Sequence, residues 1–376
     1  MNHEAPLEGV TVLDASQGIA GPYCGLILRQ QGARVIKVEP PAGDWGRNMG
    51  RQRGGHTAIS IAFNAGKESV VLDAREPRQR AALRQLAAQA DVVVQNFRPG
   101  VAARMGIGYE ELARLRPRLV YASISGYGAD GPQSTRPALD TTMQAESGLM
   151  HTNRDGAGQP QRIGLYLVDL SAGLYAAQAV GAALYRAAVA GQGRHVEISM
   201  LQVAAALQSY LIIDKALFPD AGAAAFNAPT GLFPTRDGHI YVSMLDDAML
   251  RRLSDALGMA EWRTAEDLQS SAGRIARAAE LNAQLAARMR ERTTDEWMDL
   301  LQARDILCGR VRTPHALLED PQARHLGLFA MAAQPGAGSV PLVRLPGQPP
   351  ISAGAGVSPL QGEHTEAVLR QFGIAI

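Results

Sequence analysis

The chain has 376 residues, 46% of them hydrophobic, and its 37 lysines and arginines nearly balance its 36 aspartates and glutamates. This composition fits a globular protein with one large or two ordinary cores, and the net charge of +1 excludes a field that would attract nucleic acid or an anionic membrane. Two cysteines without CxxC spacing, an N-terminus without an apolar signal core and no run of about 18 uninterrupted apolar residues lead us to expect a cytoplasmic protein without a membrane span.

The first half of the chain alternates short apolar runs with helix-like segments, a pattern typical of parallel α/β sheets. Strands are expected at residues 10–14, 34–39, 69–72, 92–95 and 119–124. Helices are expected after the first strand and at 78–90 and 109–115. The sequence therefore predicts an α/β fold with a mostly parallel sheet covered by helices.

A long apolar segment rich in small residues follows at 170–190, which predicts a buried helix, and a further strand is expected at 195–198. The composition then shifts at 220–229, which is rich in Ala and Gly, before the run TRDGHIYVSM predicts a hairpin with its turn at Asp237-Gly238. Charged amphipathic helices are expected over 246–304.

These changes in pattern divide the chain. We expect a large domain at 1–215, a smaller α+β domain at 225–315, and a C-terminal segment, 320–376, that returns to the large domain through the loose Gly/Pro stretch 334–356.

A glycine-containing turn that includes Gln17 and Gly18 follows the first predicted strand and opens a helix, where backbone N–H groups can hold phosphate. Glu39 ends the second strand about 20 residues further on, as the ribose-binding acid of a dinucleotide fold does. An NAD-dependent enzyme is therefore one alternative. Against it, the full GxGxxG spacing is absent, and Pro22 removes an N–H that a phosphate cradle would use.

The segment Asn96-Phe97-Arg98-Pro99-Gly100 follows another predicted strand directly, at the end of an α/β sheet where ligands usually bind. An amide, an aromatic ring and the guanidinium groups of Arg98 and Arg104 could meet an adenine and its phosphates. A capped loop with solvated arginines is the alternative interpretation.

Asp169 lies between the apolar run 165–168 and the long apolar helix, so one interpretation makes it the N-cap of that helix. The other makes it a nucleophile, because a carboxylate at a helix N-terminus in an apolar cleft would stay ionised and poorly hydrated. The scattered histidines show no metal-ligand spacing, and the basic loop 46–55 lacks the Lys-Ser/Thr of a P-loop and is either a mobile lid or solvated.

Many blocks of the chain, in the right order, resemble the class III CoA-transferases, the family of formyl-CoA transferase and carnitine CoA-transferase. They include PLEGVTVLDAS, AGPYCG, GARVIKVEPPAGD, FNAGKESVVLD, ADVVVQNFRPG, RLVYASISGYGADGP, LDTTMQAESGLM, VDLSAGLYAA and PLQGEHTEAVLRQFG. The resemblance thus covers most of the chain.

The resemblance implies an interlocked homodimer, in which each chain has a large Rossmann-like domain and a small domain. It implies that Asp169 attacks the donor thioester, giving an aspartyl anhydride and then an aspartyl-CoA thioester. Coenzyme A would enter as a substrate thioester together with a small carboxylic acid, and neither a metal nor a redox cofactor would be needed. The resemblance implies a CoA pocket that comprises Gln17, Asn96, Phe97, Arg104 and Met105, lined also by Leu72 and Arg75. From the two loop motifs described above, Gly18 and Arg98 are expected at the same pocket.

Two departures from the family pattern bear on the reaction. The glycine-rich loop of formyl-CoA transferase has no convincing counterpart near 221–231, which places oxalate and formate in doubt. Related racemases carry a His where this chain has Leu139, so the two-base proton exchange of a racemase lacks one base. A racemase or other CoA-ester enzyme and a CoA-binding protein without activity remain alternatives to the transferase.

Overall fold

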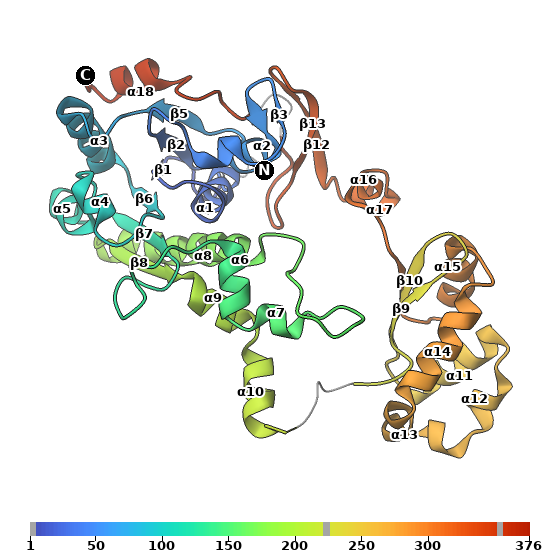
Figure 1. Ribbon diagram of the computed structural model, residues 1–376. Coiled ribbons are helices and arrows are strands. Elements are labelled where there is room, and N and C mark those ends of the chain that lie inside the picture. The colour runs from blue at the N-terminus through green and yellow to red at the C-terminus, as the bar shows by residue number, and fades with distance from the viewer. Residues whose placement is uncertain (1–4, 221–225, 352–355) are drawn as a thin grey trace. The chain divides into compact units, whose positions relative to one another are not determined.

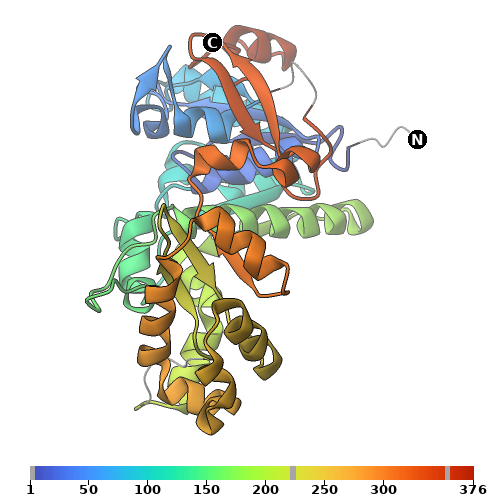
Figure 2. The ribbon, with the colours of Figure 1, turned by 90° about the vertical axis from the view of Figure 1, so that its right-hand side faces the viewer.

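The computed structural model describes residues 5–220, 226–351 and 356–376. The segment 221–231, where the glycine-rich loop of formyl-CoA transferase has no convincing counterpart, lies partly outside the described residues. The chain forms two compact units (Figures 1 and 2). The large unit comprises Met1–Ile213 and Arg324–Ile376, and the small unit comprises Asp214–Ala323. The large unit thus contains both ends of the chain.

A six-stranded sheet forms the centre of the large unit, and all of its strand pairs are parallel. In spatial order the strands are β5 (Glu68–Val71), β2 (Arg34–Glu39), β1 (Thr11–Asp14), β6 (Val92–Gln95), β7 (Val120–Ser125) and β8 (Arg194–Ser199). The parallel sheet predicted from the sequence is confirmed. The strands β2 and β5 are added on one side of β1, and β6, β7 and β8 on the other, so the strand order reverses between β1 and β6. A crevice is expected beyond the carboxyl ends of these two strands.

Two helical layers cover this sheet, because its side chains alternate between two cores (Figure 1). Val92 and Val94 join the first core with α1 and α8, whereas Val93 joins the second core with α3 and α18. The α-helices that lie wholly in the described part of the large unit are α1 (Ala20–Gln30), α2 (Ala58–Asn64), α3 (Pro77–Gln89), α4 (Val101–Arg104), α5 (Tyr109–Leu115), α6 (Asp140–Glu146), α7 (Leu149–Thr152), α8 (Leu167–Ala190), α9 (Met200–Leu207) and α18 (Thr365–Gln371).

The 24-residue helix α8 packs along α1 through small residues. At Gly173 a Cβ atom would lie 2.5 Å from the carbonyl oxygen of Ala20, so only glycine allows this approach of the two backbones. The prediction of a buried helix is confirmed for the face that packs in the core and corrected for the other, which carries exposed Leu174, Tyr185 and Val189. By length and composition alone α8 could cross a membrane, although its other face belongs to the sheet core.

The C-terminal segment joins the large unit through polar side chains as well as apolar ones. It contains the hairpin β12 (Phe329–Gln334) and β13 (Gly338–Val343), followed by α18. The buried amide of Gln334 accepts a hydrogen bond from the N–H of Ser358 and donates one to its carbonyl oxygen, each at 2.8 Å. The N–H of His364 donates to the carbonyl oxygen of Ser69, in β5, at 2.9 Å.

The small unit has a separate core around two buried tryptophans, Trp262 and Trp297. Its antiparallel strands are β9 (Gly231–Pro234), β10 (His239–Val242) and β11 (Cys308–Arg310), and its main helices are α11 (Asp247–Leu257), α12 (Ala260–Thr264), α13 (Ser271–Ala276), α14 (Ala278–Met289) and α15 (Thr294–Gln302). The hairpin predicted at Asp237-Gly238 is confirmed, and Asp237 Oδ1 accepts the N–H of Thr294 at 2.7 Å.

Candidate active site

Two loops meet beyond the carboxyl ends of β1 and β6, where a crevice is expected. The backbone N–H of Gln17 donates to Asn96 Oδ1 at 2.8 Å, and Asn96 Nδ2 donates back to the carbonyl oxygen of Gln17 at 2.7 Å. This two-way contact ties the Asn96 amide to the backbone of the first loop. Asn96 therefore shapes the crevice by joining its two sides.

A cavity of about 450 Å³ opens at this place, a size typical of small-molecule sites. Five residues predicted for the site line it together: Gln17, Asn96, Phe97, Arg98 and Asp169. The lining also includes Ile19, Ala20, Trp45, Pro99, Ile124, Ser125, Gly126, Ser134, Arg136, Pro137, Ala138, Leu139 and Met200. The structure thus brings the predicted nucleophile and the predicted CoA loop to one cavity.

The loop that carries Gln17 and Gly18 rests on Asp44 and Lys37. Asp44 Oδ1 accepts the N–H groups of Gly18 at 2.7 Å and Gly46 at 2.8 Å. Lys37 Nζ lies 2.9 Å from Asp44 Oδ2 and also donates to the carbonyl oxygen of Ser16. Since Lys37 and Asp44 are buried, these bonds hold the loop with little freedom.

Gly18 has a φ of +80°, in the left-handed region, and the Trp45 ring lies directly against it. A Cβ atom at Gly18 would lie 2.0 Å from Trp45 Cζ2, so a side chain here would displace the ring. Trp45 is 39% exposed and lines the cavity. Position 18 therefore requires glycine both for its backbone and for the place of this indole.

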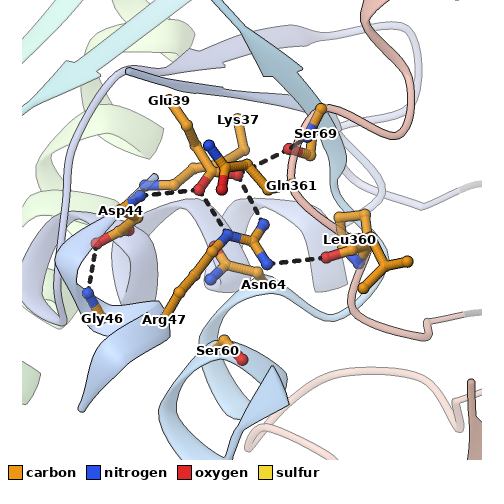
Figure 3. Close-up of polar contacts among 12 residues, drawn as sticks. Lys37, Glu39, Asp44, Gly46, Arg47, Ser60, Asn64, Ser69, Leu360 and Gln361 are labelled. Carbon is orange, nitrogen blue, oxygen red and sulfur yellow. Dashed lines mark hydrogen bonds and ion pairs between the residues drawn. The ribbon is translucent and has the colours of Figure 1, made fainter. Parts of the chain in front are cut away.

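Glu39, the ribose-binding acid of the NAD alternative, is fully buried and bound on all sides (Figure 3). Its carboxylate accepts bonds from Arg47 at 2.6 and 2.7 Å, from Ser69 Oγ at 2.7 Å and from the N–H of Asp44 at 3.0 Å. Burial would raise the pKa of Glu39, but the Arg47 hydrogen bonds and the Lys37 charge more than offset burial and lower it. This carboxylate is not free to hold a ribose, which counts against an NAD site.

The same contact corrects the interpretation of the basic loop 46–55. Arg47 is only 7% exposed and also donates to the carbonyl oxygen of Pro359 at 3.1 Å, so the start of this loop is fixed within the protein. Arg51 and Arg53 further along are exposed. The loop is therefore anchored at Gly46 and Arg47, while Asn48 and residues 50–55 are exposed.

A third buried acid, Asp14, completes this polar cluster. Lys67 Nζ lies 2.8 Å from Asp14 Oδ2, and Lys37 Nζ lies 3.9 Å from Asp14 Oδ1. Burial would raise the pKa of Asp14, but the charges of Lys37 and Lys67 more than compensate and lower it. The cluster thus sets three carboxylates (Asp14, Glu39, Asp44) against three cations (Lys37, Arg47, Lys67) beneath the Gln17–Gly18 loop.

Asp169 lies in the first turn of α8 but does not cap it. The helix begins at Leu167, with Tyr166 in the N-cap position, so Asp169 is the third helical residue. The capping carboxylate is that of Asp140, whose Oδ2 accepts the N–H of Val168 at 2.7 Å and that of Asp169 at 3.1 Å. The capping interpretation of Asp169 is therefore wrong, and the role falls to a residue 29 positions earlier.

The environment of Asp169 favours its neutral form. The side chain is 8% exposed, and no described residue donates a hydrogen bond to its carboxylate. Burial, and secondly the negative charge of Asp140, raise its pKa to about 7 from the ordinary value of 3.8. The expectation that this carboxylate stays fully ionised is corrected, since both forms are populated near neutral pH.

The remaining residues predicted for the CoA pocket lie outside the cavity lining. Leu72 is 2% exposed and its side chain packs in the core, whereas the Arg75 side chain is 85% exposed and pairs with Asp73. Arg104 is exposed, and its Nη1 would lie 3.2 Å from a Cβ at Gly100, beside the 96–100 loop. Met105 is half-buried against the second core. Their contact with CoA stays a prediction.

Sequence reasoning missed Trp45, Arg136 and Asp140. Trp45 follows a GD dipeptide in a loop, where the sequence has no signal that places it against Gly18. Asp140 begins the quoted block LDTTMQAESGLM, so its position was noticed, but its pairing with α8 is a contact over 28 residues. Among the described residues no group of three or more His, Cys, Asp or Glu side chains could hold a metal ion.

Comparisons with known proteins show which family the chain belongs to. Residues 7–365 match the model of CoA-transferase family III. The chain is 32% identical over 388 residues to human succinyl-CoA:glutarate CoA-transferase, covering 99% of this chain and 87% of the relative. It is 33% identical over 313 residues to acetyl-CoA:oxalate CoA-transferase of Acetobacter aceti, covering 81% and 80%.

Among solved structures, a CaiB/BaiF family protein from Brucella suis superposes with a TM-score of 0.88 at 29% identity, over 98% of this chain and 100% of that one. The family model and the alignment with the human relative each cover nearly the whole chain. The protein belongs to CoA-transferase family III and is a CoA-transferase.

Proposed function

We propose that the enzyme moves CoA from an acyl-CoA donor to a small carboxylic acid, with Asp169 as the covalent nucleophile. The observation that carries the proposal is the buried Asp169 carboxylate, without a hydrogen-bond donor among the described residues, in one cavity with the loops of Gln17 and Asn96. A pKa of about 7 makes this carboxylate more nucleophilic than an ordinary aspartate while leaving much of it ionised.

In the first half of the reaction, the Asp169 carboxylate attacks the acyl carbonyl of the donor. The thioester C–S bond breaks, which leaves an aspartyl-acyl anhydride and CoA thiolate. The thiolate then attacks the aspartyl carbonyl and expels the donor acid as its carboxylate, which gives an aspartyl-CoA thioester.

In the second half, the acceptor carboxylate attacks the aspartyl carbonyl and expels CoA thiolate, which forms a second anhydride. The thiolate attacks the acceptor's acyl carbon, so that the new acyl-CoA leaves and the Asp169 carboxylate is restored. Every step exchanges one acyl bond for another, so the sequence consumes no oxidant and needs no metal. Water would cleave the anhydrides, which is why the buried position of Asp169 matters.

The nucleotide end of CoA is assigned to the second loop. Phe97 and Arg98 line the cavity, and Arg104 lies beside the loop, so an aromatic ring and two guanidiniums are available to adenine and phosphates. In this proposal the large unit acts as a Rossmann-like CoA-binding domain, with its ligand at the strand-order reversal. The names of the relatives concern succinate, glutarate and oxalate, which supports small acids as partners.

A racemase on the same fold is the less favoured alternative. Position 139, where related racemases carry a histidine, is a leucine on the cavity wall. A hydrocarbon side chain there cannot exchange a proton.

We further propose that the protein is an interlocked homodimer in the cytoplasm. The support is a series of exposed apolar side chains on α8 and α10 (Ser209–Leu217), among them Tyr185, Val189, Tyr210 and Leu217. Such a surface suits a second copy of the chain. Sedimentation at nanomolar concentration tests this, and a folded monomer that appears on dilution would contradict it.

Trapping the covalent intermediate tests the proposed chemistry. Incubation with acyl-CoA and hydroxylamine, without an acceptor acid, should convert Asp169 alone to a hydroxamate that peptide mass mapping locates. Asp169→Asn should abolish both trapping and exchange while keeping the fold. Asp255→Asn, which changes an exposed carboxylate of the small unit, is the matched control and should be trapped normally at Asp169. Full exchange by a folded Asp169→Asn protein would refute the mechanism.

A further inference from the structure

A second guanidinium besides Arg98 lines the cavity of Asp169, and the proposed mechanism does not use it. Arg98 belongs to the 96–100 loop, which we assign to the CoA nucleotide. Arg136 comes instead from the segment between β7 and α6, and lines the cavity together with Leu139. The two cations thus reach the cavity from different loops.

The guanidinium of Arg136 is held in place by three neighbours. Its Nη1 and Nη2 contact Glu146 at 3.2 and 2.6 Å, Nη1 also donates to Gln133 Oε1 at 3.2 Å, and its Cζ lies 5.1 Å from the centre of the Tyr127 ring. The Tyr127 hydroxyl in turn donates to Glu146 Oε2 at 3.0 Å. The arginine is therefore oriented before any ligand arrives.

These contacts occupy the end of the guanidinium and leave its side edge open. Glu146 and Gln133 accept from Nη1 and Nη2, whereas no described residue accepts a hydrogen bond from Nε. The edge formed by Nε and Nη2 matches a carboxylate with two parallel hydrogen bonds. Because the Arg136 and Glu146 side chains are 48% and 37% exposed, water weakens their ion pair, and a second carboxylate can share the arginine.

We propose that Arg136 binds the non-reacting carboxylate of a dicarboxylic acid, so that the enzyme prefers dicarboxylic over monocarboxylic acceptors. This inference rests on the proposed function, since it requires the acid's other carboxylate to reach Asp169 in the same cavity. The apolar side chains of Ile124, Leu139 and Met200 complete the lining and suit the methylene groups of a short acid.

Acceptors matched in length test the proposal. With acetyl-CoA as donor, kcat/KM is measured for succinate against butyrate and for glutarate against pentanoate. Arg136→Gln should lower kcat/KM for the two dicarboxylates about 10- to 100-fold, as loss of a charged hydrogen bond does, and much less for the monocarboxylates. Arg136→Lys should lie between, because it keeps the charge but not the two-pronged geometry.

Glu146→Gln is the opposite test, because it removes the carboxylate that competes for Arg136. It should lower the KM for succinate and leave that for butyrate nearly constant. Calorimetric titration of the CoA-bound protein with succinate and with butyrate gives the same comparison without turnover, so the proposal stays testable if the exchange reaction itself is not found.

Three results would overturn the inference while the proposed function stands. One is equal use of butyrate and succinate by the wild-type enzyme, and another is an equal loss for both acids in Arg136→Gln. A raised KM for acetyl-CoA in Arg136→Gln would assign this residue to CoA instead. Absence of exchange with every acid, combined with tighter binding of succinate than of butyrate, would overturn the proposed function and support the subsite.

Discussion

The two sides of the active-site cavity treat buried carboxylates in opposite ways. Beneath the Gln17–Gly18 loop, three carboxylates face three cations, and the pKa values of Asp14 and Glu39 are lowered. At the start of α8, Asp140 and Asp169 lie together, and the pKa of Asp169 rises to about 7. Burial acts in the same direction on both sides, so the pairing with cations makes the difference.

The contrast distinguishes carboxylates that stabilise the structure from the carboxylate proposed to react. The three paired carboxylates are bound by buried cations and hold a loop, and Glu39 alone accepts four hydrogen bonds, so this side of the cavity serves as support. Asp169 is left without such bonds by the described residues because Asp140 satisfies the helix N–H groups in its place. Because Asp140 caps α8, the Asp169 carboxylate does not need to bond the helix N–H groups and is available for the proposed reaction.

The largest stability change should come from breaking the paired side. Asp14→Asn leaves Lys37 and Lys67 with too little negative charge in a buried site and should cost about 3–5 kcal/mol of unfolding free energy. Urea unfolding at pH 7 measures this, with Asp255→Asn as an exposed control. A loss no larger than that of the control would show that the cluster is not electrostatically tight.

An aspartate-to-asparagine change at Asp169, which has no cation beside it among the described residues, should raise the unfolding free energy instead of lowering it. Because the pKa of Asp169 is about 7 in the fold and near 3.8 when unfolded, the folded protein binds more protons between these values, and stability falls as pH rises through that window. Asp169→Asn removes this penalty and should gain about 2–4 kcal/mol at pH 8.

Below about pH 3.8 that gain should vanish, since both states then carry a neutral carboxyl group. Urea unfolding of both proteins at pH 8 and at the lowest pH where they stay folded gives the comparison. A gain that does not depend on pH would mean that packing, and not ionisation, separates the two proteins.

A smaller change is expected when only the negative charge beside Asp169 is removed. Burial is the main cause of the raised pKa and Asp140 the second, so Asp140→Asn should lower the pH midpoint of hydroxamate trapping by about one unit or less. Asp130→Asn, an exposed change, serves as the control. An upward shift would indicate that the helix start has moved and taken Asp169 into a drier place.

The parallel sheet and the meeting of two loops followed from sequence patterns. Apolar runs such as 34–39 and 92–95 were predicted as strands with their exact ends, because buried parallel strands are short and continuous in hydrophobicity. The polar residues after β6 could be placed at a ligand site from this topology alone. Asn96, Phe97 and Arg98 were found in this way.

What the sequence could not provide are contacts between distant residues that no local pattern encodes. Capping by Asp140 depends on a bond to a helix that starts 27 positions later, so the local spacing pointed to Asp169 instead. Trp45 and Arg136 are ordinary loop residues until the fold places them on the cavity wall. The exposed face of α8 was missed because a uniformly apolar helix shows no period.

The close packing at Gly173 has a consequence for how this enzyme can be re-engineered. Helix α1 starts directly after the Gln17–Gly18 loop, and α8 carries Asp169 in its first turn, so a backbone-to-backbone contact clamps the two halves of the site together. The distance between Asp169 and the Gln17–Gly18 loop is therefore fixed by the packing of the two helices. To accept acids of a new length or shape, substitutions are then best made in the loop segments that line the cavity around Trp45 and at 134–139, since these segments lie outside the packed helices.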